Sequence, residues 1–378
     1  MQIIGILAAM VIFGFIILVH EFGHYIVGKL SGCSVSKFSI GWGPKLLAFK
    51  RRETEYRISW IPFIGGYVRM PGIEGESAEL TEDEAKDIKK YNLKTFEEIR
   101  TWQKFLVFIA GVGMQVVVAA LILTVVVCMM GKPMTKVYVM GVAEGSPAQS
   151  AGLKGADIIL KVGETGLSSV EELTGYISDK AGRKVKLTIE REEKRQTLII
   201  VPRYDEEHQK VLIGINIAQG AYFEKESMVW HDYVFGGVIF TGRLTVQMAK
   251  AIWMLITGEI PLKGSAMGPV GIIALTKDIA QTGFINMVLF FVLININIGF
   301  INLIPYPALD GGHVLFLAIE KTFRFKIKEK VKEVLVMAGF ASLILLILYL
   351  TYNDVGRFIS SRFGKDAPRV QQGVEDKE

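Results

Sequence analysis

Four apolar stretches, each long enough to cross a bilayer, constrain the fold of this chain more than any other feature. They cover residues 1–27, 102–130, 284–304 and 333–352. A helix needs about 20 mostly apolar residues to cross the hydrocarbon core of a membrane. The mean hydropathy of +0.37, combined with 21% charged residues, indicates spans joined to water-exposed parts. The sequence therefore predicts a polytopic α-helical membrane protein with four transmembrane helices, embedded in a lipid bilayer.

Basic residues gather in two of the connections between these spans. One cluster runs from Lys29 to Arg57, after the first span, and the other runs from Lys321 to Lys332, before the last. Because cytoplasmic loops carry an excess of Lys and Arg, we expect both connections to be cytoplasmic. Both termini and the long insert at residues 131–283 are then extracytoplasmic. The net charge of +5 thus reflects topology, and we expect no nucleic-acid partner.

The connecting segments differ in character. Residues 28–101 begin with strand-like alternation and end, over 80–100, with a charged pattern typical of a cytoplasmic amphipathic helix. The β-region either dips against the bilayer or forms a surface meander. Residues 223–283 favour an amphipathic segment on the membrane surface, because a fifth span would bury Arg243 and Lys250. A basic connection at 305–332 and a polar tail at 353–378 complete the chain.

The part of the insert at residues 131–222 predicts a soluble α+β domain with its own core. Its stretch SPAQSAGLKGADIILKVGE, from Ser146 to Glu164, resembles the PDZ pattern, with Ala156 where Gly is usual. PDZ domains bind an extended peptide by adding it to a sheet edge. A folded spacer that controls access sterically is the alternative.

The first span contains the motif HEFGH, with His20, Glu21 and His24. Residues four apart lie on one face of a helix, so the two histidines can bind the same metal ion. Neutral imidazoles suit Zn²⁺, and a neighbouring carboxylate can take a proton from metal-bound water. Polar groups in lipid without partners are costly, which favours a metal site over a chance match.

A third protein ligand must come from another part of the chain. The candidates are acidic or histidine residues in or near the other apolar regions, namely Glu259, Asp278, Asp310, His313 and Glu320. Asp310 stands out because Pro305 and Pro307 break the helix before it, and two glycines follow it. The alternative for Asp310 is the N-cap of a helix that begins near Gly312.

Taken in order, several motifs resemble the site-2 protease family. They are HEFGH in the first span, FSIGWGPKL and GGYVRM in the β-region, the PDZ-like insert, GPVGI at residues 268–272, and N-x-x-P-x-P-x-L-D-G at residues 302–311. Within that family the layout is similar to the bacterial RseP/RasP type, with a single PDZ-like domain where the best-known members carry two. The fold class is then a four-span membrane protein with a membrane-associated β-region and an inserted PDZ-like domain.

The resemblance also implies an activity and a set of residues. Zinc is expected on His20, His24 and Asp310, with Glu21 as the catalytic acid and base, and with Asn302 and Asn297 positioning the substrate. The implied enzyme is an intramembrane zinc metalloprotease of the bacterial inner membrane that acts in regulated intramembrane proteolysis. Its expected substrates are transmembrane segments of membrane-anchored proteins, such as anti-sigma factors or remnant signal peptides.

Two other classes of protein fit the sequence less well. A membrane receptor or scaffold with a structural zinc is disfavoured, because such a zinc normally has four protein ligands and would leave Glu21 without a purpose. A metal-ion carrier is disfavoured because it needs a continuous polar path, which the other spans do not display.

Overall fold

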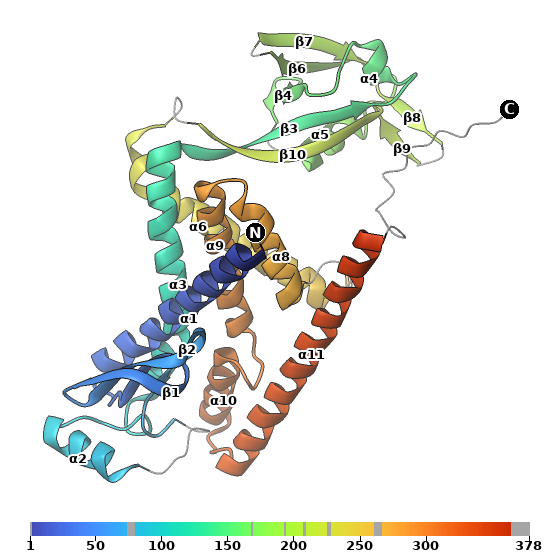
Figure 1. Cartoon of the computed structure of the whole chain (residues 1–378). Helices are drawn as coiled ribbons and strands as arrows, with labels where there is room; N and C mark the ends of the chain where they lie inside the picture. Colours follow the sequence, from blue (N-terminus) through green and yellow to red (C-terminus); the bar gives the residue numbers. More distant parts are fainter. Residues whose placement is uncertain are drawn as a thin grey trace. The chain divides into compact units, whose positions relative to one another are not determined.

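The computed structural model describes residues 2–73, 80–167, 169–192, 194–206, 209–224, 228–260 and 267–363 (Figure 1). Parts of three predicted segments lie outside the described residues. They are residues 74–79 of the segment 28–101, residues 225–227 and 261–266 of the segment 223–283, and residues 364–378 of the expected tail. The chain divides into two compact units, Met1–Leu123 with Val238–Glu378, and Thr124–Gly237. Each unit is described by itself.

Four of the described helices are long and apolar enough to cross a membrane. They are α1 (Gln2–Leu30), α3 (Thr101–Met130), α9 (Phe284–Leu303) and α11 (Glu329–Phe363). None of them contains proline, so their internal hydrogen bonds can satisfy the backbone within lipid. The prediction of a four-span membrane protein is confirmed, and α11 continues through residues 353–363 of the expected tail.

Helices α1, α3 and α9 pack around a shared apolar core in the first unit. Ile16 of α1, Leu123 of α3 and Ile296 of α9 are almost completely buried there. The core matters for the site described below, because it holds the three helices that carry or support the polar residues.

The segment 223–283, which is expected at the membrane surface, contains two helices among its described residues. Helix α6 (Trp230–Ile256) includes Arg243 and Lys250. Helix α8 (Pro269–Ala280) begins within the GPVGI motif, whose Gly268 is the N-cap. The buried carboxylate of Asp354 on α11 accepts a hydrogen bond from the Gly271 backbone N–H at 2.7 Å. This contact joins α8 to the last span. The position of α6 at the membrane surface stays a prediction.

The β-region forms a sheet from two bent strands, β1 (Lys37–Arg51) and β2 (Thr54–Arg69). Phe38 pairs with both Tyr56 and Val68, so β1 and β2 each contribute two segments, and 37–40 runs parallel to 55–58 and antiparallel to 66–69. Their order across the sheet is 45–51, 54–59, 37–40 and 66–69. Gly41, Gly43 and Gly65 adopt φ values of 89°, 98° and 102° where the strands bend, a conformation that favours glycine. The segment 66–69 is therefore an outer strand.

The charged helix after this sheet is shorter than expected. Helix α2 spans Glu82–Tyr91, with Thr81 and Glu84 forming a reciprocal capping box at its start. Asn92 adopts a φ of 52° and ends the helix. The following residues pair instead with the linker after α1, where Lys94 N–H donates to the Gly32 carbonyl at 3.0 Å. The predicted helix over residues 93–100 is thus wrong.

The second unit contains a sheet in the order β10-β3-β4-β6-β7, with β5 beside β4, and a separate β8–β9 hairpin. The strands are β3 (Lys132–Val142), β4 (Ile158–Val162), β5 (Thr165–Gly166), β6 (Val185–Arg191), β7 (Lys194–Ile200), β8 (Arg203–Asp205), β9 (Lys210–Leu212) and β10 (Ile215–Glu224), and the helices are α4 (Pro147–Ser150) and α5 (Val170–Ile177). Their apolar residues form one core, as an independent α+β domain requires. This is the PDZ-like domain that the sequence predicts.

Candidate metal centre

His20, His24 and Asp310 converge in the first unit. The Nε2 atom of His20 lies 3.0 Å from Asp310 Oδ2, and the Nε2 atom of His24 lies 3.4 Å from the same oxygen. The two Nε2 atoms are 3.1 Å apart. Among the described residues, these three form a group whose ligand atoms all lie within 4.8 Å of one another.

The chain path after α9 explains how Asp310 reaches the histidines. Helix α9 ends at Leu303, and α10 (Asp310–Phe323) begins with the aspartate itself. Gly312 lies so close to the preceding turn that a Cβ atom there would be 2.2 Å from the Tyr306 carbonyl oxygen. The N-cap of α10 is Leu309, so the alternative of Asp310 as a helix N-cap is wrong.

Helix α3 orients both imidazoles. The Nδ1 atom of His24 lies 2.7 Å from the Val107 carbonyl oxygen, and the Nδ1 atom of His20 lies 3.3 Å from Gln115 Oε1. Both partners are acceptors, so each Nδ1 carries the proton and donates. Each Nε2 is then left with a lone pair directed toward Asp310.

This support depends on a close approach of α3 to α1 at Gly111. A Cβ atom on Gly111 would lie 2.5 Å from His20 Cε1 and 2.6 Å from His24 Nε2. Gly23, between the two histidines, meets α3 in the same way, because its Cβ would lie 2.2 Å from the Ala110 carbonyl oxygen. Glycine on both helices therefore allows the imidazoles to contact the α3 backbone.

The three facing atoms fit a divalent cation. Two imidazole lone pairs and one carboxylate oxygen are all acceptors, and Asp310 Oδ2 is a buried atom with no hydrogen-bond donor among the described residues. Such atoms repel one another unless a positive charge lies between them. Ligands of a tetrahedral zinc at about 2.05 Å would be roughly 3.3 Å apart, close to the separations found here. The donor set and its spacing thus suit zinc.

A cavity of about 260 Å³ adjoins these atoms and includes Glu21 and Asn302 in its lining. Its lining residues are Ile17, His20, Glu21, Gln115, Ile298, Asn302, Ala308, Leu309, Asp310 and His313. Asn297 is not among them, because it lies five residues before Asn302, about 140° around α9. The structure brings five of the six predicted site residues together.

The other candidate ligands have different surroundings. Glu320 pairs with Lys332 at 2.8 Å, and Glu259 accepts a hydrogen bond from Thr257 Oγ1 at 3.1 Å. The imidazole of His313 stacks on Phe108, with ring centroids 5.0 Å apart. Asp278 lies on α8. None of the four belongs to the described group of ligand atoms.

Sequence reasoning missed three residues that support the site, namely Gly111, Gln115 and Asn295. Gln115 and Asn295 are completely buried, and Asn295 Nδ2 donates to the Gln115 backbone carbonyl at 2.8 Å. A buried amide in an apolar span is costly unless it is bonded. The presence of Gln115 in the second span was the available signal for a polar site there.

The membrane helices, the convergent ligand set and the adjoining cavity define an intramembrane metalloprotease of the site-2 protease class. The chain belongs to Peptidase family M50, whose family model matches residues 8–346. The predicted family and the predicted zinc metalloprotease are therefore confirmed.

Two relatives and one solved structure are similar to this chain. The chain is 29% identical to the zinc metalloprotease RasP of Oceanobacillus iheyensis, over 93% of this chain and 99% of that protein. It is 28% identical to the regulator of sigma-W protease RasP of Bacillus subtilis, over 93% of this chain and 98% of that protein. A solved PDZ domain of the SdrC-like protein from Listeria monocytogenes is 28% identical, covering 22% of this chain and 86% of that chain with a TM-score of 0.21.

Proposed function

We propose that His20, His24 and Asp310 hold the zinc ion of this protease and that Glu21 is its catalytic acid and base. The observation that carries the proposal is the cluster of three lone-pair atoms, with Asp310 Oδ2 at 3.0 and 3.4 Å from the two imidazoles. A zinc ion held there would polarise the scissile carbonyl of the substrate and lower the pKa of its bound water to about 7.

Glu21 is the group that moves protons in the proposed reaction. Its side chain lines the same cavity as His20 and Asp310. There it accepts a proton from the attacking water and later delivers one to the leaving amine nitrogen. Asn302, in the wall of the same cavity, is placed to donate a hydrogen bond to the substrate backbone. Asn297 remains a proposed positioning residue on another face of α9.

The outer strand of the β-region is the proposed binding edge for the substrate. A transmembrane helix hides its carbonyl groups in internal hydrogen bonds, so the substrate must unwind before attack. Strand addition would hold the unwound segment extended. A Cβ on Gly66, in the outer segment 66–69, would lie 3.7 Å from Glu21 Cγ, which brings this edge to the proposed acid and base.

The proposed location is the bacterial inner membrane, with both termini and the PDZ-like domain extracytoplasmic. The two basic connections support this orientation. The likeness to a regulator of sigma-W protease supports membrane-anchored anti-sigma factors as substrates, and remnant signal peptides are the second proposed class. The PDZ-like domain would test whether the outer part of a substrate has been removed, either by binding its new end or by steric exclusion.

The Glu21→Gln variant tests the proposed function in full-length protein in detergent. Wild-type protein should bind one zinc and cut spanning peptides, and a chelator should stop cleavage until zinc returns. Glu21→Gln should keep the zinc and lose at least about a thousandfold in rate, within the range that general acid–base catalysis contributes. Undiminished cleavage by Glu21→Gln would remove Glu21 from the mechanism. Membrane proteins that co-purify with Glu21→Gln would identify the substrate.

A further inference from the structure

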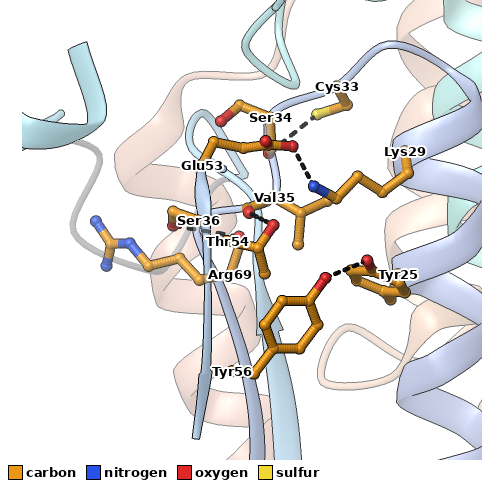
Figure 2. A network of polar contacts seen from close by, with 10 residues as sticks. All are labelled: Tyr25, Lys29, Cys33, Ser34, Val35, Ser36, Glu53, Thr54, Tyr56 and Arg69. Carbon is orange, nitrogen blue, oxygen red and sulfur yellow. Dashed lines mark hydrogen bonds and ion pairs between the residues drawn. The ribbon is translucent and has the colours of Figure 1, made fainter. Parts of the chain in front are cut away.

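Two polar contacts fasten the β-region to α1 just beyond the metal ligands (Figure 2). The Tyr25 and Tyr56 hydroxyl oxygens lie 2.6 Å apart, and Lys29 forms an ion pair with Glu53. Tyr25 directly follows the ligand His24 in sequence. The contacts therefore start from the helix that carries the proposed metal centre.

The Glu53 contact is unusual for the turn of a hairpin. Glu53 lies between β1 and β2, where turn residues are normally exposed, yet its side chain is only 4% exposed. A buried carboxylate is costly unless it is paired, and the pair with Lys29 supplies its partner. Next to it, Thr54 Oγ1 donates to the Val35 carbonyl at 2.6 Å (Figure 2). The turn is thus held against the end of α1.

The sheet also meets α1 at its other end. A Cβ on Gly66 would lie 3.7 Å from Glu21 Cγ and 3.8 Å from Ile17 Cγ2. Four of the α1 residues that contact the sheet are therefore Ile17, Glu21, Tyr25 and Lys29, each four after the last. This spacing places them on one face of the helix. The histidines lie on the neighbouring face, so Glu21 stands between the outer strand and the ligand cluster.

The strand pairing alone does not fix where the sheet lies along α1. The pairing of β1 with β2 contains register irregularities along 40–47, and the strands bend at glycines. A side chain in a strand alternates between faces, so a slip of one residue would present the other face of an added strand to Glu21. An external contact must therefore hold the register.

We propose that the Lys29–Glu53 ion pair and the Tyr25–Tyr56 hydroxyl pair form a register clamp, which decides which substrate peptide bond lies opposite Glu21. Tyr25, Lys29, Glu53 and Tyr56 are positioning residues in this proposal. They act through the outer strand 66–69 and contact neither the metal ligands nor the substrate. The inference rests on the proposed function, since it assumes strand addition beside Glu21.

The test compares clamp variants of the full-length protein on a synthetic single-span peptide of about 25 residues that the wild-type enzyme cuts. Mass spectrometry of the products gives the bonds that are cut, and metal analysis gives the zinc content. Glu53→Gln and Lys29→Met each remove one charge of the pair. Tyr56→Phe removes one hydroxyl group and keeps the ring, so it reports on the clamp even if the charge variants unfold.

The clamp predicts a change of cleavage position without loss of metal. Cuts at bonds one or two residues from the main site should rise about tenfold in Glu53→Gln and Lys29→Met, and less in Tyr56→Phe, as expected for loss of a coupled contact. The double variant Lys29→Glu with Glu53→Lys exchanges the two charges of the ion pair and should restore cleavage at the main site. Lys50→Met is the matched control. It removes an ion pair between Lys50, a 51% exposed residue of the same sheet, and Asp87 of α2.

Two results would overturn the clamp. The first is an unchanged set of cut bonds in folded, zinc-containing clamp variants. The second is a loss of zinc in proportion to activity, which would mean that the contacts hold α1 itself. A wild-type protein that binds zinc but cuts no spanning peptide would instead overturn the proposed function, and the clamp with it.

Discussion

His20 Nε2 and Asp310 Oδ2 lie 3.0 Å apart, although one belongs to the first span and the other begins the helix after the third. His24 Nε2 lies 3.4 Å from the same oxygen. One carboxylate oxygen thus faces both imidazoles, and the centre is complete only when α1 and α10 are both in place. A change that separates α1 from α10 should therefore weaken metal binding even where the protein stays folded.

The contact at Gly111 predicts a selective loss of zinc. In Gly111→Ala the added methyl group would lie 2.5 Å from His20 Cε1, so the imidazoles must move. We expect zinc affinity to fall by about 10–100-fold, the range found when groups that orient metal ligands are disturbed. Competition with a chelator measures the affinity.

Gly113→Ala is the control for this prediction, since a Cβ at Gly113 of the same helix would meet nothing within 4 Å. It should keep wild-type zinc affinity and gain up to about 1 kcal/mol in helix stability. Equal zinc binding by the two variants would show that α3 does not press on the histidines.

The hydrogen bond from His20 Nδ1 to Gln115 Oε1 predicts a graded effect at Gln115. Gln115→Leu removes the acceptor and should lower zinc affinity by about 10–100-fold. Gln115→Glu keeps an oxygen for the imidazole N–H and should lose less affinity. Zinc titration of both variants in detergent measures the difference, and equal losses would argue against a role for the acceptor oxygen.

The PDZ-like domain has its own pH dependence, set by Asp157. Burial alone would raise the pKa of this carboxyl, but two hydrogen bonds from Arg191 at 2.6 Å and one from the Lys154 N–H outweigh it and hold the pKa below its usual value. A carboxyl with a lowered folded-state pKa contributes stability above its unfolded pKa near 4, and that stability disappears as the pH falls further.

Asp157→Asn should therefore lower the unfolding free energy of this domain by about 1.5–3 kcal/mol at neutral pH, the value of hydrogen bonds to a charged group. The difference between the variant and the wild type should shrink as the pH falls below about 4, and it should vanish below the lowered folded-state pKa of Asp157. Hydrogen exchange of the β4 and β6 amides in the full-length protein checks both points. If the variant and the wild type differ in unfolding free energy by the same amount at neutral and at acid pH, the charge of Asp157 is not the cause.

Much of the fold follows from local patterns in the sequence. The spans are long apolar runs, and the PDZ-like domain has strand alternation together with recognisable turns. The end of α2 could not be predicted, because it depends on the left-handed Asn92 and on tertiary pairing of Lys94 with the linker after α1. The doubled β-region depends on glycine bends whose direction only the packed structure decides.

The site also contains residues that the sequence predicted and residues that it did not. The motif HEFGH indicates its own chemistry, because both histidines lie on one helix face. Asp310 stands out among five candidates because prolines precede it and glycines follow it, and the family resemblance then implies that it is the third ligand. The supports Gly111, Gln115 and Asn295 were missed because their roles arise where α1, α3 and α9 meet, and no local pattern describes that meeting.

X-ray absorption spectroscopy at the zinc edge, on full-length zinc-loaded protein, reports the atoms bound to the metal. We expect two imidazole nitrogens and oxygen ligands at about 2.0–2.2 Å, with no sulfur at about 2.3 Å. Asp310→Asn should change this spectrum and weaken zinc binding. A sulfur ligand, or a spectrum that is unchanged in Asp310→Asn, would contradict a centre built from His20, His24 and Asp310.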